Sequence, residues 1–254
     1  MIGRWIFLRD GRLSGRAKLA LAGLFVAALI ASFPLRAALG WADGDSTRVS
    51  AREVGGTVWD GWIADLRVGG LAFGDVQAAL RPLPLLIGRR EFSLVRPGPA
   101  ALPEFAAIAA GGSGWAAVRE VQGQVALGDG FGTIPATSLG FRDFRLAIDG
   151  NRCREAGGQV SLLLAPFSEL MPGAIALSGT ARCDKGALYV PMSGPSGLEK
   201  LLLRVQADGR WRADLVLSGL PVEVSGPLLD LGFSARPGGI GMSASGQLTQ
   251  NQIR

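Results

Sequence analysis

An uncharged apolar stretch, residues 19–35, constrains this chain more than any other feature of its sequence. Five Lys or Arg residues and a single acid, Asp10, precede the stretch. A helix that crosses a membrane needs about 20 predominantly apolar residues, and the aliphatic stems of Lys18 and Arg36 extend the available apolar length. We therefore expect one transmembrane helix over residues 19–39. Because positive charge holds a short flank in the cytoplasm, we expect residues 1–18 to be a cytoplasmic leader and residues 40–254 to lie on the opposite side of the membrane.

Two other interpretations of this stretch compete with an uncleaved anchor. A cleaved signal peptide has the same order of basic, apolar and small residues, with Ala38-Leu39-Gly40 as its best cleavage site. The long basic leader favours the anchor, although cleavage of residues 1–40 remains an alternative. A buried helix of a soluble protein would carry a polar stripe along one side, and this stretch has none.

The basic character of the chain belongs to its amino-terminal end. Of the 26 Lys and Arg residues, five precede the apolar stretch and Arg36 flanks it, which leaves 20; of the 21 Asp and Glu residues, all but Asp10 follow the stretch, which also leaves 20. The region that follows is therefore neutral. Nucleic-acid-binding domains concentrate positive charge on a folded surface, so we expect no nucleic-acid partner.

Beyond residue 40 the sequence indicates a mainly β domain. Short runs that alternate apolar and polar residues recur about every ten residues, with Gly, Asp or Pro between them, as in antiparallel sheets. The 38 glycines favour a strongly twisted, curled antiparallel sheet, because glycine in strands marks bulges and bends. The clearest hairpin covers residues 201–217, with a type I′ turn expected at Asp208-Gly209. A short helix is expected from Pro103, ended by glycines at a flexible joint, so a joint within the domain is possible near residues 103–115.

The residue types available exclude most catalytic and metal chemistry. The chain contains no histidine, the commonest general base and metal ligand, so we expect no metal, no cofactor and no enzymatic activity. Ser193 lacks both a nucleophile-elbow sequence and a histidine to activate it. In an exported domain the two cysteines, Cys153 and Cys183, predict one disulfide, whereas the CxxC spacing of a redox pair is missing. Six aspartates are expected in solvated structural roles at turns or on polar strand faces: Asp60, Asp65, Asp75, Asp143, Asp208 and Asp214.

Two short segments stand out from the alternating runs. The first is GGTVWDGW, residues 55–62, in which glycines surround two tryptophans; the second is LRPLPLLIGR, residues 80–89. A purely structural interpretation makes the first a strand with core aromatic residues and the second an edge strand bent by Pro82 and Pro84. A binding surface is the alternative.

The order of these segments resembles the type II secretion system protein N family. The resemblance rests on the basic leader, the single span, a G-T-x-W-x-G segment, an R-P-L-x-L-L-x-G segment and two spaced cysteines. The family implies a single-pass inner-membrane protein of Gram-negative bacteria, with a cytoplasmic amino terminus and a periplasmic β domain. It offers no catalytic residues. The residues that carry the resemblance, and that are interaction candidates, are Gly56, Thr57, Trp59, Gly61, Arg81, Pro82, Leu86 and Gly88, accompanied by Leu83, Leu85, Cys153 and Cys183.

These features together predict a non-enzymatic accessory or assembly component of type II secretion, the export of folded proteins across the outer membrane. Its expected partners are inner-membrane secretion-platform proteins, which would contact the transmembrane helix or an exposed sheet edge by strand addition, and the lipid bilayer around residues 19–39. The alternative function is a periplasmic lipid-binding or lipid-shuttling envelope protein with an apolar β-groove. The oligomeric state is left open.

Overall fold

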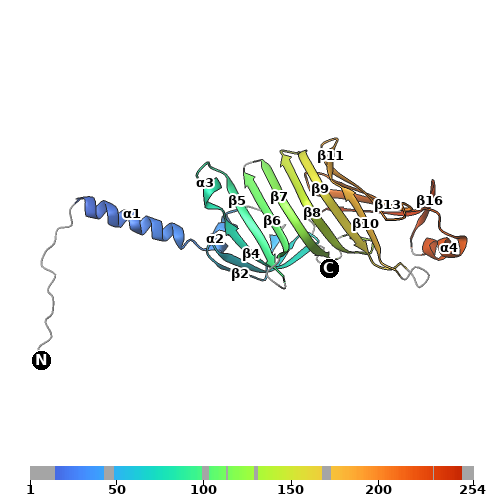
Figure 1. The fold of residues 1–254 in the computed structure, drawn as a ribbon, viewed down its shortest axis with the longest axis horizontal. Helices are drawn as coiled ribbons and strands as arrows, with labels where there is room; N and C mark the ends of the chain where they lie inside the picture. Colours follow the sequence, from blue (N-terminus) through green and yellow to red (C-terminus); the bar gives the residue numbers. More distant parts are fainter. Residues whose placement is uncertain are drawn as a thin grey trace, which may run out of the picture.

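A single antiparallel sheet of 16 strands dominates the computed structural model (Figure 1). The structure describes residues 15–42, 49–98, 103–112, 114–128, 131–167, 173–230 and 232–247. The predicted mainly β, antiparallel fold is confirmed. The strands are β1 (Val49–Ser50), β2 (Glu53–Gly56), β3 (Gly61–Val68), β4 (Leu71–Leu80), β5 (Arg90–Pro97), β6 (Pro103–Gly112), β7 (Trp115–Leu127), β8 (Ala136–Asp149), β9 (Arg152–Leu164), β10 (Ile175–Thr180), β11 (Arg182–Asp184), β12 (Ala187–Ser193), β13 (Glu199–Val205), β14 (Arg210–Leu217), β15 (Ser234–Arg236) and β16 (Gly239–Gln247).

Most neighbouring strands in the sheet are also consecutive in the chain. The order is β1-β3-β4-β5-β6-β7-β8-β9-β10-β12-β13-β14-β16-β15, with β2 paired to β3 and β11 paired to β12. Strand β4 also pairs with β7 through Leu71–Leu127 and Ala72–Ala126, so the sheet closes partly on itself there. Most of the connections are therefore hairpins, as the regular turn spacing predicted.

The main core fills the inner side of the curled sheet. Strands β9 and β14 alternate buried and exposed residues, as strands with one apolar face do. Helix α4 (Val222–Asp230) adds the fully buried Leu228 to the same cluster. In this part of the sheet the apolar inner face is occupied by the protein's own side chains. Six leucines with at most 1% exposure form its centre: Leu162, Leu164, Leu177, Leu201, Leu215 and Leu217.

A second, smaller core lies at the end of the sheet where the amino-terminal helices meet it (Figure 1). It consists of Leu35 and four buried residues of β3 and β4: Ile63, Leu66, Val76 and Ala78. This cluster is separate from the main core. The helical segment that supplies Leu35 is therefore packed against the sheet.

The helix expected over residues 19–39 is interrupted, and its predicted bounds were wrong. Helix α1 (Gly15–Ala31) ends before Pro34, and a second helix, α2 (Leu35–Ala42), begins after it. Proline has no backbone N–H and cannot continue the helical hydrogen bonds. Among the residues that the structure describes, no helix combines the length and the hydrophobicity needed to cross a membrane. Of the five basic residues that precede the apolar stretch, Arg16 and Lys18 belong to α1, whereas Arg4, Arg9 and Arg12 lie outside the described part of the chain.

The short helix expected from Pro103 was also wrong, because these residues form strand β6. Strand β6 pairs with β5 on one side and with β7 on the other, and Gly112 faces Trp115 across the second hairpin. Phe105 and Ala107 are buried on its inner face. Alanine favours helix, but by only a small free energy per residue. Hydrogen bonding to two neighbouring strands and burial of these side chains outweigh that preference.

The β13–β14 hairpin is present as predicted, but its turn differs from the expected type I′. Gly209 has a φ of 86°, whereas Asp208 is not in the positive-φ region. The N–H of Gly209 donates to the carbonyl of Gln206 at 3.0 Å, and the N–H of Gln206 donates to the carbonyl of Arg210 at 2.8 Å. This pattern is a type I turn followed by a left-handed glycine, which needs one positive φ angle instead of two.

Candidate functional site

The G-T-x-W-x-G segment forms the turn between β2 and β3. Gly56 and Gly61 face each other at the end of the strand pair. The Thr57 N–H donates to the Asp60 carbonyl at 3.0 Å, and the Asp60 N–H donates to Thr57 Oγ1 at 3.2 Å. Gly56 has a φ of 79°, and a Cβ atom there would lie 2.5 Å from the Asp60 carbonyl oxygen. A side chain at position 56 is therefore incompatible with this turn.

This turn holds the segment that follows α1. Pro34 forms a β-bridge with Thr57, and the Val58 N–H donates to the Phe33 carbonyl at 2.9 Å. The Trp59 indole N–H donates to the Ile30 carbonyl at 2.8 Å. In a continuous helix the Ile30 carbonyl would accept the N–H of residue 34, which proline lacks. The Trp59 indole thus supplies the donor that Pro34 cannot, and the same carbonyl also accepts the Phe33 N–H over a longer distance of 3.3 Å. We call residues 56–61 the helix socket.

Leu35 fills the space beneath the helix socket. Its side chain is fully buried in the smaller core. A Cβ atom at Gly61 would lie 2.5 Å from Leu35 Cδ2 and 2.7 Å from the Thr57 carbonyl oxygen. Glycine at position 61 therefore allows Leu35 and the turn to approach closely.

The R-P-L-x-L-L-x-G segment is a helical turn, not the proline-bent edge strand of the structural interpretation. Arg81 is the N-cap residue of α3 (Pro82–Leu85), and Pro82 takes the first helical position, where a missing N–H is harmless. The Gly88 N–H donates to the Leu85 carbonyl at 2.9 Å, and the Arg89 N–H donates to the Pro84 carbonyl at 3.0 Å. With Gly88 at a φ of 74°, these bonds form a Schellman motif that ends the helix.

The two segments meet at a cavity of about 780 Å³ next to the end of α1. The Val58 carbonyl accepts the Leu80 N–H at 2.7 Å, which connects the helix socket directly to the residue before Arg81. The cavity is lined mainly by apolar side chains from the end of α1 and the residues after it, from the helix socket, and from α3 and β5. They include Ile30, Phe33, Val58, Trp59, Leu85 and Phe92. The structure thus brings together both candidate segments around the junction of α1 and the sheet.

Several residues of this junction were not singled out from the sequence. Phe33, Pro34 and Leu35 all lie within the range predicted for the transmembrane helix, residues 19–39. A proline inside an apolar stretch breaks helical hydrogen bonding, so Pro34 was the feature that could have revealed the junction. Leu83 and Ile87, like the predicted candidate Leu86, are largely exposed on the α3 turn.

Residues 47–243 match the family of the type II secretion system (T2SS), protein N. The match covers more than half of the chain. The chain belongs to this family. No curated protein and no solved structure matches it.

The match to the protein N family includes the helix socket, the α3 turn and both cysteines, whereas α1 precedes its first residue. Membership identifies the chain as a type II secretion component. The family is one of secretion accessory components and is not known as a family of enzymes. Among the residues that the structure describes, no three His, Cys, Asp or Glu side chains gather at one point where they could hold a metal ion.

The six aspartates noted in the sequence take part in structural contacts. Asp60 closes the helix socket, and the Asp65 N–H donates to Asp75 Oδ1 at 2.9 Å. Asp143 accepts a hydrogen bond from Gln122, Asp208 accepts the Arg210 N–H within its turn, and Asp214 pairs with Arg212. Asp65 and Asp143 adopt positive φ angles of 51°, where their strands carry irregular register. Aspartate tolerates this conformation better than most residues.

Glu91 of β5 is the buried charged residue of the described part of the chain, with 4% exposure. Its carboxylate pairs with Arg119 and lies 3.7 Å from the Arg81 guanidinium. The Arg81 N–H also donates to the Glu91 carbonyl at 2.8 Å. Glu91 therefore fixes the first residue of the R-P-L-x-L-L-x-G segment to β5.

Replacing Glu91 with glutamine is expected to lower the free energy of unfolding by about 1–3 kcal/mol, since a buried charged hydrogen bond is lost. Equilibrium urea unfolding measures this change. The matched control is Glu155→Gln, because Glu155 also pairs with an arginine but its side chain is 61% exposed; that variant should change stability by less than about 1 kcal/mol. Equal effects of the two substitutions would contradict the special role of Glu91.

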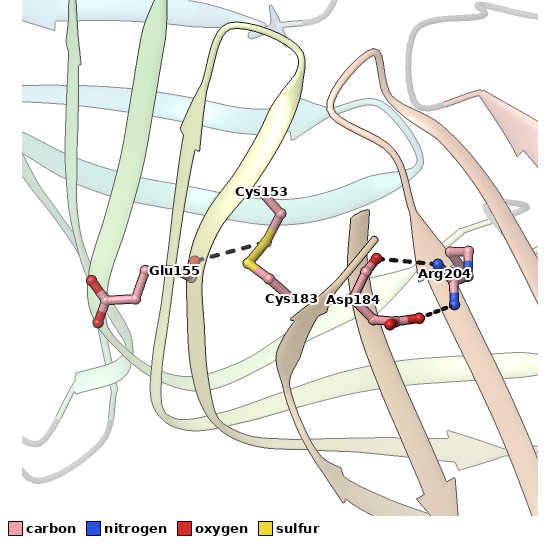
Figure 2. Close-up of a disulfide and its surroundings, with 5 residues drawn as sticks. All are labelled: Cys153, Glu155, Cys183, Asp184 and Arg204. Atoms are coloured by element: carbon pink, nitrogen blue, oxygen red, sulfur yellow. Dashed lines mark hydrogen bonds and ion pairs between the residues drawn. A yellow bond between two sulfur atoms is a disulfide. The ribbon is translucent and has the colours of Figure 1, made fainter. Parts of the chain in front are cut away.

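The predicted disulfide is confirmed between Cys153 of β9 and Cys183 of β11, with Cα atoms 5.6 Å apart (Figure 2). The Cys153 sulfur lies 3.9 Å from the Glu155 carbonyl oxygen. An oxidised sulfur has no proton to donate, so this is a van der Waals contact. Beside the disulfide, Arg204 of β13 donates to both the carboxylate and the carbonyl of Asp184. The short strand β11 is thus attached on both sides.

Arginine partners lower the pKa of three aspartates. Hydrogen bonding from Arg204 lowers the pKa of Asp184, and the Arg210 backbone N–H lowers that of Asp208. A hydrogen bond from Arg212 likewise lowers the pKa of Asp214, although partial burial opposes the change. Each group binds its proton less readily in the folded chain than in the unfolded chain. Its contribution to stability is therefore present above the unfolded pKa and is lost as the pH falls through the folded pKa.

We expect the unfolding midpoint to stay constant between about pH 5.5 and 8 and to fall below about pH 4. The chain has no histidine to titrate in the neutral range, and the three aspartates lose their advantage only in acid. Thermal unfolding followed by circular dichroism across this pH range tests the expectation. A midpoint that changes steadily between pH 6 and 8 would contradict it.

Replacing Trp59 with phenylalanine is expected to loosen the end of α1 by about 1 kcal/mol, because the ring is kept and the hydrogen bond to the Ile30 carbonyl is lost. Hydrogen exchange of the Val58 amide, which donates to the Phe33 carbonyl, should accelerate about fivefold. Trp62→Phe is the control, because Trp62 is 43% exposed on the neighbouring strand. Unchanged exchange in Trp59→Phe, or an equal change in both variants, would contradict the capping role of Trp59.

Proposed function

We propose that this type II secretion component is a non-enzymatic assembly protein of the inner membrane, attached through α1 and carrying its β domain in the periplasm. The observation that carries the proposal is the convergence of both candidate segments on the junction between α1 and the sheet. The helix socket fixes an apolar helix to a folded domain, and the α3 segment lines the cavity beside that attachment. That arrangement suits a protein whose position relative to the membrane matters more than any bound substrate.

The surface of α1 supports attachment to a membrane. Its apolar side chains are exposed, and none of its residues is buried against the protein. A helix that is apolar all round is stable only in an apolar environment. We expect the bilayer and the apolar helices of secretion-platform proteins to provide that environment. The residues concerned, each more than half exposed, are Leu19, Leu21, Leu24, Phe25, Val26, Leu29 and Ile30.

An open sheet edge on β16 supports partner binding by strand addition. Strand β16 pairs with β14 along residues 240–247, but β15 covers only residues 239–241 on its other side. Within the described part of the chain, residues 242–247 therefore present a free row of backbone groups to a partner strand. The periplasmic part of a platform protein is the partner that we propose for this edge.

Photo-crosslinking in secreting cells tests the proposal. A benzophenone amino acid at Ser245, exposed on the open edge, is expected to capture a secretion-platform subunit, and deletion of the gene is expected to reduce release of secreted proteins. The control position is Leu202, which is 43% exposed on β13 between two paired strands. Capture of no platform subunit from Ser245, together with normal secretion in the deletion strain, would overturn the proposal.

The lipid-shuttling alternative gains no support from the inner face of strands β9, β10, β13 and β14. That face is filled by leucines with at most 1% exposure, where an acyl chain would need open space.

A further inference from the structure

Three large apolar side chains project from the α3 turn into solvent. Leu83, Leu86 and Ile87 are 76%, 83% and 71% exposed. The turn that carries them is fixed by Pro82 at its start and by the Schellman motif at its end. A rigid turn that displays adjacent apolar side chains is typical of a contact with a membrane or with another protein.

The α3 turn lies next to the end of α1. Leu85 of α3 lines the same cavity as Leu29 and Ile30 of α1, and Figure 1 shows α3 at the end of the sheet to which α1 is joined. The exposed apolar surface of α1 is therefore continuous, through the cavity, with that of α3. A membrane that surrounds the end of α1 would also reach the α3 turn.

The length of α1 places its end deep in that membrane. Its 17 residues rise about 25 Å, whereas a bilayer hydrocarbon core is about 30 Å thick. A short apolar helix draws its flanking segments toward the lipid. The β domain follows α1 with only three residues before α2, and the helix socket holds those residues firmly. The end of the sheet that carries α3 is thus drawn to the bilayer surface.

Charge beside the apolar cluster fits phospholipid headgroups. Arg89 and Arg90 are exposed immediately after the turn, and among the described residues neither has a carboxylate within 4.0 Å. The guanidinium group of one arginine can donate two parallel hydrogen bonds to the oxygens of one phosphate group. Apolar side chains flanked by arginines are typical of segments that lie in the interface of an anionic membrane.

We propose that the α3 turn inserts into the periplasmic leaflet beside α1, with Leu83, Leu86 and Ile87 among the acyl chains and with Arg89 and Arg90 on the phosphates. The occupant of this surface is the phospholipid bilayer itself. The inference rests on the proposed attachment through α1. In this arrangement α1 and the α3 turn both hold the β domain at the membrane. The two contacts together fix the orientation of the domain as well as its distance from the bilayer.

Fluorescence quenching in vesicles tests this inference with the full-length chain. Because both native cysteines form the disulfide, a single added cysteine takes an environment-sensitive dye at one place. The variants are Leu86→Cys on the α3 turn, Leu24→Cys on α1 and Leu202→Cys on the sheet. Each is reconstituted into phosphatidylethanolamine and phosphatidylglycerol vesicles, with or without a mixture of lipids that carry a nitroxide near the glycerol backbone or at the middle of the acyl chain.

We expect the nitroxide lipid to quench the dye at position 86 at least about twofold and to leave the dye at position 202 unchanged. Quenching at position 24 without quenching at position 86 would overturn the inference and leave the α1 anchor intact. Quenching at neither position would overturn the anchor and the inference together. In a Leu86→Cys chain, replacing Arg89 and Arg90 with glutamine should reduce the quenching; unchanged quenching would overturn the assignment of the arginines to phosphate.

Discussion

Replacing Leu35 with alanine is expected to release the end of α1 from the β domain while the main core stays folded. Leu35 is fully buried in the smaller cluster with Ile63 and Val76, and truncating a buried leucine costs about 2–5 kcal/mol. The main core does not include any of these residues. The loss of stability should therefore be local to the junction.

Hydrogen exchange distinguishes local release from general unfolding. The Val58 amide, which donates to the Phe33 carbonyl, is expected to lose protection by a factor of about 30 or more. Amides of β13 and β14 should keep theirs. Leu202→Ala is the control, because Leu202 is 43% exposed and should leave both regions unchanged. Full protection of Val58 in Leu35→Ala would mean that Leu35 does not hold the junction.

Removing the disulfide by Cys153→Ser with Cys183→Ser is expected to lower the free energy of unfolding by about 3–4 kcal/mol. The bridge closes a loop between residues 30 apart, and the chain-entropy estimate for such a loop is about 3.6 kcal/mol. For a domain of this size the unfolding temperature should fall by about 10 °C. Differential scanning calorimetry on the full-length protein measures the change.

Reduction provides the control for this variant. A reductant should destabilise the natural protein by a similar amount and leave the serine variant unchanged. If the serine variant instead unfolds within about 2 °C of the natural protein, the disulfide does not stabilise the native fold as the chain-entropy argument requires.

The sheet could be predicted from the sequence because each strand carries its own pattern. Alternation of buried and exposed residues within β9 and β14, and turn residues such as Gly209, are local properties that can be identified without knowing which strands pair. The disulfide followed from the number of cysteines and the expected exported location. The exceptions, β6 and the 206–210 turn, occur where pairing with neighbouring strands decided between two locally acceptable conformations.

The junction could not be predicted, because its contacts join residues distant in sequence. Trp59 donates to Ile30 across 29 positions, and Gly61 is small because Leu35 approaches it. The sequence marked Gly56, Thr57, Trp59 and Gly61 as unusual but gave no reason for them. The uncharged stretch concealed the break at Pro34, since hydrophobicity does not distinguish a side chain that faces lipid from one that packs on a sheet.

The membrane topology of the chain is the property to measure most directly, because attachment through α1 and a periplasmic β domain together require the carboxyl terminus to lie outside the cytoplasm. Alkaline phosphatase fused after the last residue of the chain is active only outside the cytoplasm. We predict an active fusion that stays with the membrane after an alkaline carbonate wash. An inactive fusion, or an active one released in soluble form, would contradict the account.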